Sequence, residues 1–571
     1  MTQFANYKAP HEDSSFLCEP PADNWSAKAD CHSRLWLTEI RWSGIELNEI
    51  RQWTRRDALR YSHCNTNTCS DLNSETDDDL KRWYVSGHQP ELFHPGVWFK
   101  NFILYAAAQR QNAVSLNVVI DHDSSTPVSI IAPVTLSDGT LGTKHISVSD
   151  PTVKASVENV PWELTFENEP SDWYRFQEEV NGLELLPRAP ASRESLGPLA
   201  NRIIPLVVQA IGEGAPLGKA IASARHQIEL DSGVRNHEIL FSQLAQGRGF
   251  SAFVFEILST LESFRDIYHS SREAYREHHR IKNASQPIPR LSQQFDGEFE
   301  WLEAPFWVYR KDDPIRRPLW VRYTTNSLIV SNLNGWESTI DRCGSFEAVN
   351  FWWEELLRKQ VAIRPRALTT TLFMRLAIAD LFLHGIGGGK YDQITDMIIR
   401  KWCGIEPPAF AVATATLFLP MKSIATAARS TEHSSETTGA IRERLRDYKF
   451  NPERLVSDHF FPRLEELLRE HQTLLNSIPT GAMKAQWHLT LQDNKSEIRM
   501  ALNVTEHEVS EQLRQSIEVD RQKKIRASRE YSMALFPDVL TQQKLIELAS
   551  ANFASTEKPF VQQSREKLKL M

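Results

Sequence analysis

The chain is poor in cysteine. Six cysteines occur among 571 residues, and none belongs to a CxxC pair. Cys64 and Cys69 have four residues between them, but no second pair completes a zinc site. We therefore expect reduced thiols, without a disulfide framework or a structural zinc centre.

A long apolar run is also missing. The most hydrophobic stretch, LFMRLAIADLFLHGIG, is interrupted by Arg375 and Asp380 and is shorter than a membrane span. The N-terminus carries acidic residues and has no apolar core, unlike a signal peptide. We expect a cytoplasmic protein that does not associate with membranes.

Positive charge is not in excess. The 73 acidic side chains outnumber the 65 lysines and arginines, the formal charge is -8, and no basic stripe is interleaved with aromatic residues. A nucleic-acid partner is therefore not expected. The motifs GxSxG, HExxH and GxGxxG after a strand are absent too, which removes the common signatures of serine hydrolases, metalloproteases and dinucleotide-binding enzymes.

The sequence does contain the pattern of a parallel sheet. Residues 82–87 (RWYVSG) predict a strand that runs into glycine, a helix follows with Pro95 in its first turn, and residues 114–121 predict the next strand. Residues 362–404 return to a strand followed by a helix, and residues 409–419 are expected to supply a last buried strand. Between them, residues with hairpin, helical and antiparallel-strand patterns form a long insertion, so the α/β sheet is split.

The C-terminal part has a different pattern. Residues 453–478 carry apolar side chains close to heptad spacing, and residues 483–530 form a second long, charged and periodic stretch after IPTGAM. This predicts two long helices joined by a proline-glycine turn, which is an antiparallel coiled-coil arm. We expect the arm to mediate a homodimer.

Candidate site residues are concentrated in the turn SGHQPELFHPGVWFKN. Gly87 and Gly96 permit close approach of the backbone, and the helix that begins near Gly96 directs free N–H groups at an anion. His88, His94 or Lys100 would then donate to developing negative charge.

Two other interpretations of these histidines remain open. His88 and His94 could join Asp121, His122 and Asp123, which end the next strand, around a divalent metal. In the simpler alternative the histidines are turn or core residues with satisfied nitrogens.

The second cluster is HGIGGGKYDQITD. It is not a Walker A loop, because His384 occupies the position of the first glycine and Tyr391 replaces the serine or threonine that would hold magnesium. Asp392 and Asp396 share one helix face, which could be its solvated side. The glycines nevertheless predict a nest for an anion beside Lys390, the alternative being a tight loop against the sheet. These glycines are Gly385, Gly387, Gly388 and Gly389.

A third cluster precedes the glycines. Arg364, Arg366 and Arg375 are close to the glycine loop in sequence. A guanidinium makes paired, charge-assisted hydrogen bonds to carboxylate or phosphate. Arg366 and Arg375 are therefore candidate anion-binding residues.

The order of these parts is similar to that of the bacillithiol-synthesis cysteine-adding enzymes. The resemblance is carried by SGHQPELFHPG, VVIDHD, RPRALTTTLFMRLAIADLFLHGIGGG and REYSMALFP, and in order of elements it extends over most of the chain from Trp83. It implies a ligase-like protein on a Rossmann-type core related to the HxGH nucleotidyltransferases. It also implies that the site is formed by Gly87, His88 and Gln89, by His122 and Asp123, and by Arg366 with the glycines at 385–389.

The chain departs from the family at several of these positions. His88 stands where the family has glutamine, and the HxGH motif survives only as His94-Pro95-Gly96-Val97. Gly388, Gly389 and Lys390 replace acidic residues of the family's glycine loop. A changed pocket suggests a changed substrate, so we expect a divergent relative and not the cysteine-adding enzyme itself.

The expected fold is therefore an α/β, Rossmann-like parallel sheet split by a mainly helical insertion, followed by the coiled-coil arm. The expected regions are a weakly ordered tail (1–33), the first half of the core (34–125), the insertion (126–345), the second half of the core (346–420), and the arm with a C-terminal packing segment (421–571).

Three functions are compatible with these features. The first is a ligase or transferase that joins an amino acid or similar amine to a small carboxylate-bearing or phosphorylated substrate, with ATP or another nucleotide as a candidate cofactor. The second is a metal-assisted transferase or hydrolase that uses His88, His94, Asp121 and His122. The third is a dimerising scaffold without catalysis.

Overall fold

The computed structural model describes residues 4–32, 40–65, 81–149, 159–166, 169–186, 197–283, 288–422, 436–455, 462–502 and 505–553. They form two compact units. The larger unit contains the residues up to 132, residues 144–420 and the segment that begins at Arg529, and the smaller unit contains residues 133–143 and 421–528.

A six-stranded sheet organises the larger unit. Its order is β1-β16-β15-β4-β5-β8. All neighbouring strands are parallel except β1, which runs antiparallel to β16. The strands are β1 (Ser15–Glu19), β16 (Ala409–Thr416), β15 (Leu381–His384), β4 (Arg82–His88), β5 (Ala113–Val119) and β8 (His237–Leu240).

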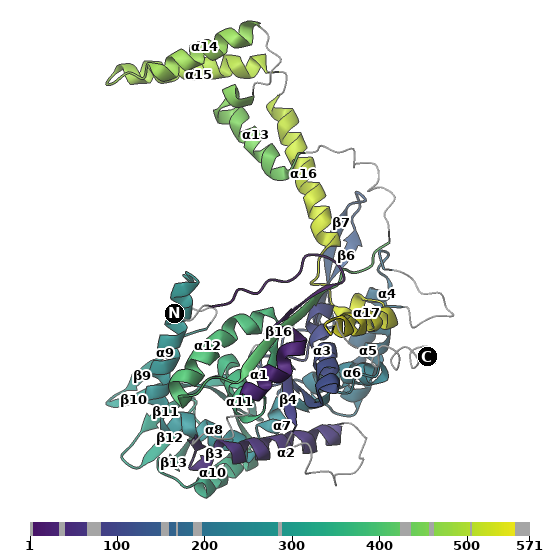
Figure 1. The fold of residues 1–571 in the computed structure, drawn as a ribbon, viewed down its shortest axis with the longest axis vertical. Coiled ribbons are helices and arrows are strands. Elements are labelled where there is room, and N and C mark those ends of the chain that lie inside the picture. The colour runs from purple at the N-terminus through teal and green to yellow at the C-terminus, as the bar shows by residue number, and fades with distance from the viewer. Residues whose placement is uncertain are drawn as a thin grey trace. The chain divides into compact units, whose positions relative to one another are not determined.

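The chain reverses its direction across this sheet. It proceeds from β4 to β5 and β8, and then returns to the other side of β4 for β15 and β16. The connections β4-α3-β5 and β15-α12-β16 therefore run in opposite directions, and right-handed crossovers place α3 (Pro95–Gln111) and α12 (Ile386–Cys403) on opposite faces of the sheet (Figure 1). A switch point lies between β4 and β15, where parallel sheets leave a crevice at the carboxyl ends of the strands.

The strand, turn, helix and strand predicted around the first glycine turn are confirmed. Trp83, Tyr84 and Val85 of β4 are fully buried, which explains why this strand reads as a continuous apolar run. The outer strand β8 was missed, because its four residues lie in a region whose periodicity is helical.

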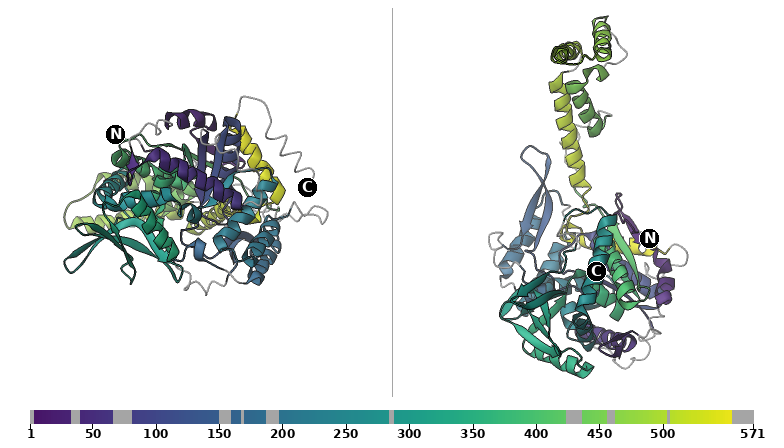
Figure 2. Two further views of the ribbon diagram at one scale, coloured as in Figure 1. Left: turned by 90° about the horizontal axis from the view of Figure 1, so that it is seen from below. Right: turned by 90° about the vertical axis from the view of Figure 1, so that its left-hand side faces the viewer.

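The region between β5 and β15 is a large insertion. A hairpin of β6 (Ser129–Thr135) and β7 (Leu141–Ser147) forms a separate ribbon (Figure 2). Several helices follow it: α4 (Pro170–Asn181), α5 (Ala200–Gly212), α6 (Leu217–Asp231), α7 (Phe241–Leu244), α8 (Arg248–Ser259) and α9 (Leu261–His278).

An antiparallel sheet completes the insertion. Its order is β13-β12-β11-β10-β14, with β9 on β10. The last strand, β14, had been assigned to the second half of the core, but it pairs with β10 and leads into α11 (Ala367–Ala377). The elements are β9 (Gln293–Asp296), β10 (Phe299–Arg310), β11 (Asp313–Tyr323), β12 (Ser327–Ser331), β13 (Glu337–Asp341), α10 (Phe346–Arg358) and β14 (Val361–Pro365).

The prediction of a weakly ordered tail over residues 1–33 is wrong for the residues that the structure describes. β1 adds an edge strand to the sheet, and α1 (Trp25–His32) packs on it. Trp25 is fully buried, packs edge-on against Tyr84, and donates from Nε1 to Pro20 O across 3.0 Å. One aromatic anchor therefore orders a segment whose average composition is polar.

Apart from the tip of the β6-β7 hairpin, the described residues of the smaller unit are mainly helical, but one predicted helix is divided. The stretch 483–530 forms α15 (Met483–Ala501) and α16 (Glu506–Arg526). The second helix starts at a capping box formed by Thr505 and Glu508. A capping box is a local signal for the N-terminus of a new helix. α15 packs on α14 (Pro462–Asn476), while α16 packs on α13 (Thr438–Phe450).

Among the helices that the structure describes, none combines the length and the apolar character needed to cross a bilayer.

Candidate functional site

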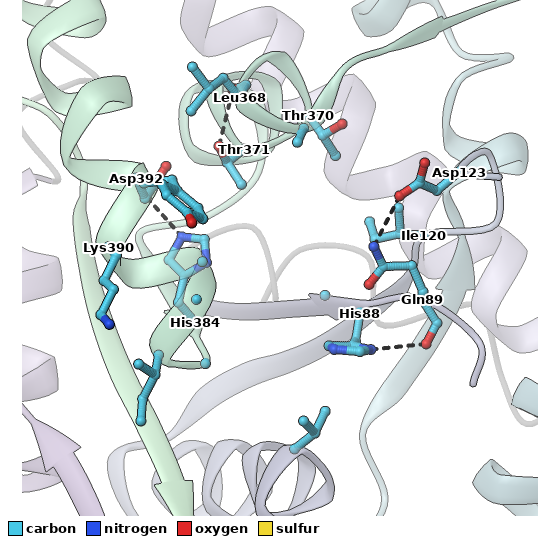
Figure 3. A pocket seen from close by; sticks show the side chains of 18 of the residues that line it. His88, Gln89, Ile120, Asp123, Leu368, Thr370, Thr371, His384, Lys390 and Asp392 are labelled. Carbon is cyan, nitrogen blue, oxygen red and sulfur yellow. Dashed lines mark hydrogen bonds and ion pairs between the residues drawn. The ribbon is translucent and has the colours of Figure 1, made fainter. Parts of the chain in front are cut away.

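A cavity of about 900 Å³ lies in the larger unit at the carboxyl ends of the parallel strands (Figure 3). It is placed where β4 and β15 diverge, as expected for a ligand crevice at a switch point. Most of the candidates from the sequence line it together: Gly87, His88, Gln89, His94, Lys100, His122, Asp123, Arg366, His384, Gly385, Gly387, Gly388 and Lys390. Asp121 and Arg375 are not among its lining residues.

The start of α3 fixes His94. Its Nδ1 accepts from Gly96 N across 3.1 Å, so the ring proton is on Nε2. Burial and the nearby Arg529 lower the pKa of His94 to about 4, which keeps the ring neutral. A Cβ at Gly96 would lie 2.2 Å from Ala415 O, so only glycine fits there.

His88 presents the opposite polarity. Its Nδ1 lies 3.1 Å from Gln89 O, and because a carbonyl can only accept, Nδ1 carries the proton and Nε2 has a lone pair. Burial, reinforced by Lys100, lowers the pKa of His88 to about 3. The two histidines are thus a neutral acceptor and a neutral donor at the same turn.

Lys100 is a buried cation behind this turn. Its Nζ donates to Gly87 O across 3.1 Å, and none of the described carboxylates forms an ion pair with it. Burial and repulsion from Arg225 lower the pKa of Lys100 to about 7. An anion in the cavity would favour its charged form.

The three residues of the Asp-His-Asp run after β5 lie in two different environments. Asp121 accepts from the backbone N–H and the hydroxyl of Ser242, and burial raises its pKa to about 7. His122 and Asp123 face the cavity: His122 Nε2 lies 3.3 Å from Thr370 Oγ1, and Asp123 accepts from Arg316.

The alternative of a metal site at Asp121 and His122 finds no support among the described residues, since the two do not belong to a group of three candidate ligands. In the described part of the chain, the group of three candidate ligands comprises His226, Glu229 and Glu238. Asp121 is engaged by Ser242 and is not among the residues that line the cavity, whereas His122 is.

The carboxylates of the His226 group already have partners within the protein. Arg225 donates to Glu229 Oε1 across 2.7 Å and to Glu238 Oε2 across 2.5 Å. Trp98 also donates to Glu229 across 2.7 Å. These contacts balance the buried carboxylates and anchor α3 to α6, so the group is a structural network.

The glycine loop forms the start of α12. Gly385 is the N-cap, and the first hydrogen bond within the helix runs from Gly389 N to Gly385 O across 2.9 Å. A Cβ at Gly385 or Gly387 would meet nothing within 4 Å, and neither has a positive φ. Neither packing nor backbone conformation requires glycine at these two positions. Both line the cavity at the start of α12, where the first N–H groups have no acceptor within the helix.

Arg375 is not an anion-binding residue. It is fully buried and donates to Asp392 Oδ2 across 2.7 Å and to Asp396 Oδ1 across 2.6 Å. Asp392 is buried as well, which corrects the interpretation of these carboxylates as a solvated helix face. His384 completes the group, with Nε2 2.8 Å from Asp392 Oδ2.

Arg366 and Arg316 line another side of the cavity, where they stack near Trp307. The Arg366 guanidinium lies 4.1 Å from the centre of the Trp307 ring, and Arg316 lies 5.1 Å from it. Arg366 also pairs with Glu303 across 2.6 Å. Arg366 and Trp307 thus both line the cavity, and the anion-binding role of Arg366 stays a prediction.

Several lining residues were missed by sequence reasoning. Tyr7 and Lys8 come from the segment assigned to the tail, and Trp307 and Arg316 come from the insertion. No local motif marks them, since they reach the cavity only through tertiary packing. Arg529 also lines it, and it does begin one of the patches that carry the family resemblance.

Together these features define a mixed α/β protein with a large cavity at the carboxyl ends of parallel strands, in which charged side chains and histidines lie among apolar surface. The chain matches no protein-family model, and comparison with curated proteins gave no match.

Proposed function

We propose that the larger unit is a Rossmann-type core that binds an anionic small molecule, and that the protein is a ligase or transferase distantly related to the cysteine-adding enzymes. The ligand would be a nucleotide or another phosphorylated or carboxylate-bearing compound. The reaction would join an amine to a carboxylate.

The strand order supports this assignment. Taken in chain order from β4, the parallel strands β4, β5, β8, β15 and β16 are arranged as 3-2-1-4-5. This is the order of dinucleotide-binding sheets, in which the ligand lies beyond the carboxyl end of the first strand.

The observation that carries the proposal is the convergence of helix starts and uncompensated cations on one cavity. The N-terminal residues of α3, α11 and α12 all line it, and each directs positive partial charge into it. Lys8 and Lys390 also line it, and neither forms an ion pair with a described carboxylate. The acidic side chains of the cavity are already paired with arginines: Asp123 with Arg316, Asp392 with Arg375 and Glu530 with Arg529.

The two histidines of the first turn suit a condensation. The Nε2–H group of His94 can donate to an oxyanion, and the Nε2 lone pair of His88 can accept from a substrate N–H group. Amide formation also requires a leaving group on the carboxylate, which a nucleoside triphosphate would supply as co-substrate.

Anion binding tests the proposal directly. Pyrophosphate and ATP should raise the unfolding temperature, because a ligand that binds only the folded state stabilises it. Gly387→Ala should weaken pyrophosphate binding at least tenfold in calorimetry without loss of stability. Gly212→Ala, at the end of α5 where a Cβ also meets nothing within 4 Å, is the matched control.

Two results would contradict the proposal. Absence of binding by either anion would remove the ligand class, and equal pyrophosphate affinity of Gly387→Ala and wild type would remove the glycine loop as its site.

We also propose that the smaller unit is a coiled-coil-like arm that forms a homodimer. The pair α14 and α15, with the turn between them, leaves large apolar side chains in solvent: Ile478, Met483, Leu489 and Met500 are 58%, 71%, 60% and 76% exposed. Light scattering should give a dimer mass for the wild type and a monomer mass for a Leu489→Lys, Met500→Lys variant, and a monomeric wild type would contradict the proposal.

A further inference from the structure

The ring of His384 is held in one orientation at the end of β15. Its centre lies 4.5 Å from that of Phe382 and 5.7 Å from that of Phe410. Both aromatic rings belong to strands of the parallel sheet. The imidazole is therefore positioned by the core of the fold, whereas the histidines at 88 and 94 belong to a turn.

Asp392 determines which nitrogen of this ring carries the proton. Although burial opposes ionisation of Asp392, Arg375 and His384 hold the pKa of its carboxyl well below the usual range. An ionised carboxylate can only accept, so His384 Nε2 donates to Asp392 Oδ2 across their 2.8 Å contact. The lone pair of the imidazole is thereby on Nδ1.

Nδ1 is left open toward the ligand space. It makes no hydrogen bond to any residue that the structure describes, and Figure 3 shows it on the side of the ring that faces the middle of the pocket. A Cβ at position 388 would lie 2.6 Å from Nδ1. Gly388 thus keeps the nitrogen accessible at the start of α12, next to Gly387 and Lys390 of the proposed anion site.

The other candidate bases of the cavity are less suitable. Asp123 accepts hydrogen bonds from Arg316 and Gln89, and His122 Nε2 faces the Thr370 hydroxyl. His88 has an open acceptor nitrogen, but no described carboxylate pairs with it to stabilise a cationic ring. Of the cavity histidines, His384 has both an open nitrogen and an ionised carboxylate behind it.

We propose that His384 is the group that accepts a proton from the ligand, and that Asp392, held by Arg375, is its positioning residue. The proton passes from an N–H, O–H or S–H group of the ligand to Nδ1, and the Asp392 carboxylate offsets the charge of the imidazolium that forms. The ligand is then an anion whose nucleophilic group lies close to its phosphate or carboxylate. This ligand class, though not the accessibility of Nδ1, rests on the function proposed above.

Alkylation by iodoacetate and iodoacetamide tests the inference without knowledge of the substrate. The Nδ1 lone pair displaces iodide from the methylene carbon of either reagent, forming an N–C bond while the C–I electron pair leaves with iodide. Peptide mapping should find His384 modified at Nδ1, at least tenfold faster with the anionic iodoacetate. His488, an exposed histidine of the smaller unit, gives the intrinsic ratio of the two reagents.

Two variants separate the roles. Asp392→Asn can still accept from Nε2 but lacks the charge that stabilises the cationic transition state, so alkylation of His384 should slow at least fivefold while that of His488 is unchanged. Lys390→Gln should reduce the advantage of iodoacetate over iodoacetamide at His384, and this comparison remains decisive if the Asp392 variant does not fold.

The outcomes distinguish this inference from the proposed function. If both reagents modify His384 equally fast at Nδ1, the result supports His384 as an accessible base and contradicts an anion site next to it. If pyrophosphate binds but His384 of the native protein reacts no faster than His488, or is modified at Nε2, the anion site stands and the assignment of His384 is overturned. Unchanged alkylation in Asp392→Asn would remove Asp392 as the positioning residue.

Discussion

The side chain of Gln393 holds the backbone of Ala5, which is 388 residues away in the chain. Oε1 accepts from Ala5 N across 2.5 Å, and Nε2 donates to Ala5 O across 3.1 Å. Phe4 packs edge-on against Tyr275 at 5.3 Å, and Pro10 O accepts from Thr416 across 2.7 Å. These contacts fasten an N-terminal strap, residues 4–11, of which Tyr7, Lys8, Ala9 and His11 line the cavity.

Gln393→Ala should release this strap. Loss of both hydrogen bonds to Ala5 leaves only the flanking anchors, so tryptic cleavage after Lys8 should become at least fivefold faster while the unfolding temperature changes little. Gln209→Ala, an exposed glutamine that bonds only Glu213, is the control. Cleavage at the wild-type rate would show that the other contacts fix the strap alone.

Lys100→Met should stabilise the protein at neutral pH. Burial lowers the pKa of Lys100 to about 7, below its value of about 10.4 in an unfolded chain, so folding carries a cost that is full below pH 7 and disappears as pH rises toward 10. After loss of the hydrogen bond to Gly87 O, the net gain at pH 7 should be on the order of 2 kcal/mol.

Denaturant unfolding at a series of pH values measures this effect. The difference between Lys100→Met and wild type should shrink between pH 7 and 10, because wild-type stability rises over that interval. A constant difference would mean that Lys100 keeps an ordinary pKa in the folded protein.

Arg375→Ala should be strongly destabilising. It leaves the Asp392 and Asp396 carboxylates without their cation in a buried position, which costs about 3–5 kcal/mol. Arg400→Ala breaks the exposed pair with Glu406 and should cost less than about 1 kcal/mol. Similar unfolding free energies for the two variants would contradict the buried role of Arg375.

Gly96→Ala should destabilise the fold where Gly212→Ala does not. The new Cβ would lie 2.2 Å from Ala415 O and 2.5 Å from Arg529 Nη2, and a backbone oxygen cannot move as a flexible side chain can. We expect a loss of roughly 2 kcal/mol or more in denaturant unfolding. A neutral effect would show that α3 shifts away from β16 without cost.

The parallel sheet and its first glycine turn follow from the sequence because their signals are local. A continuous apolar strand, a proline in the first turn of a helix and a second apolar strand specify β4, α3 and β5 over fewer than 40 residues. The glycines after β15 are equally local, since a run of glycines ahead of a helix exposes backbone N–H groups wherever that helix lies. Most of the residues that these patterns singled out line the cavity.

Tertiary structure alone decided the partners of those residues. Arg375 and Arg366 are nine positions apart and look alike in sequence, yet Arg375 is enclosed with Asp392 while Arg366 faces Trp307. The strap at Lys8 and the aromatic wall at Trp307 reach the cavity from distant segments, which no periodicity can reveal. Sequence determines which side chains can carry charge or donate a proton, whereas burial and packing determine which of them stay neutral, which are already paired, and which remain free to meet a ligand.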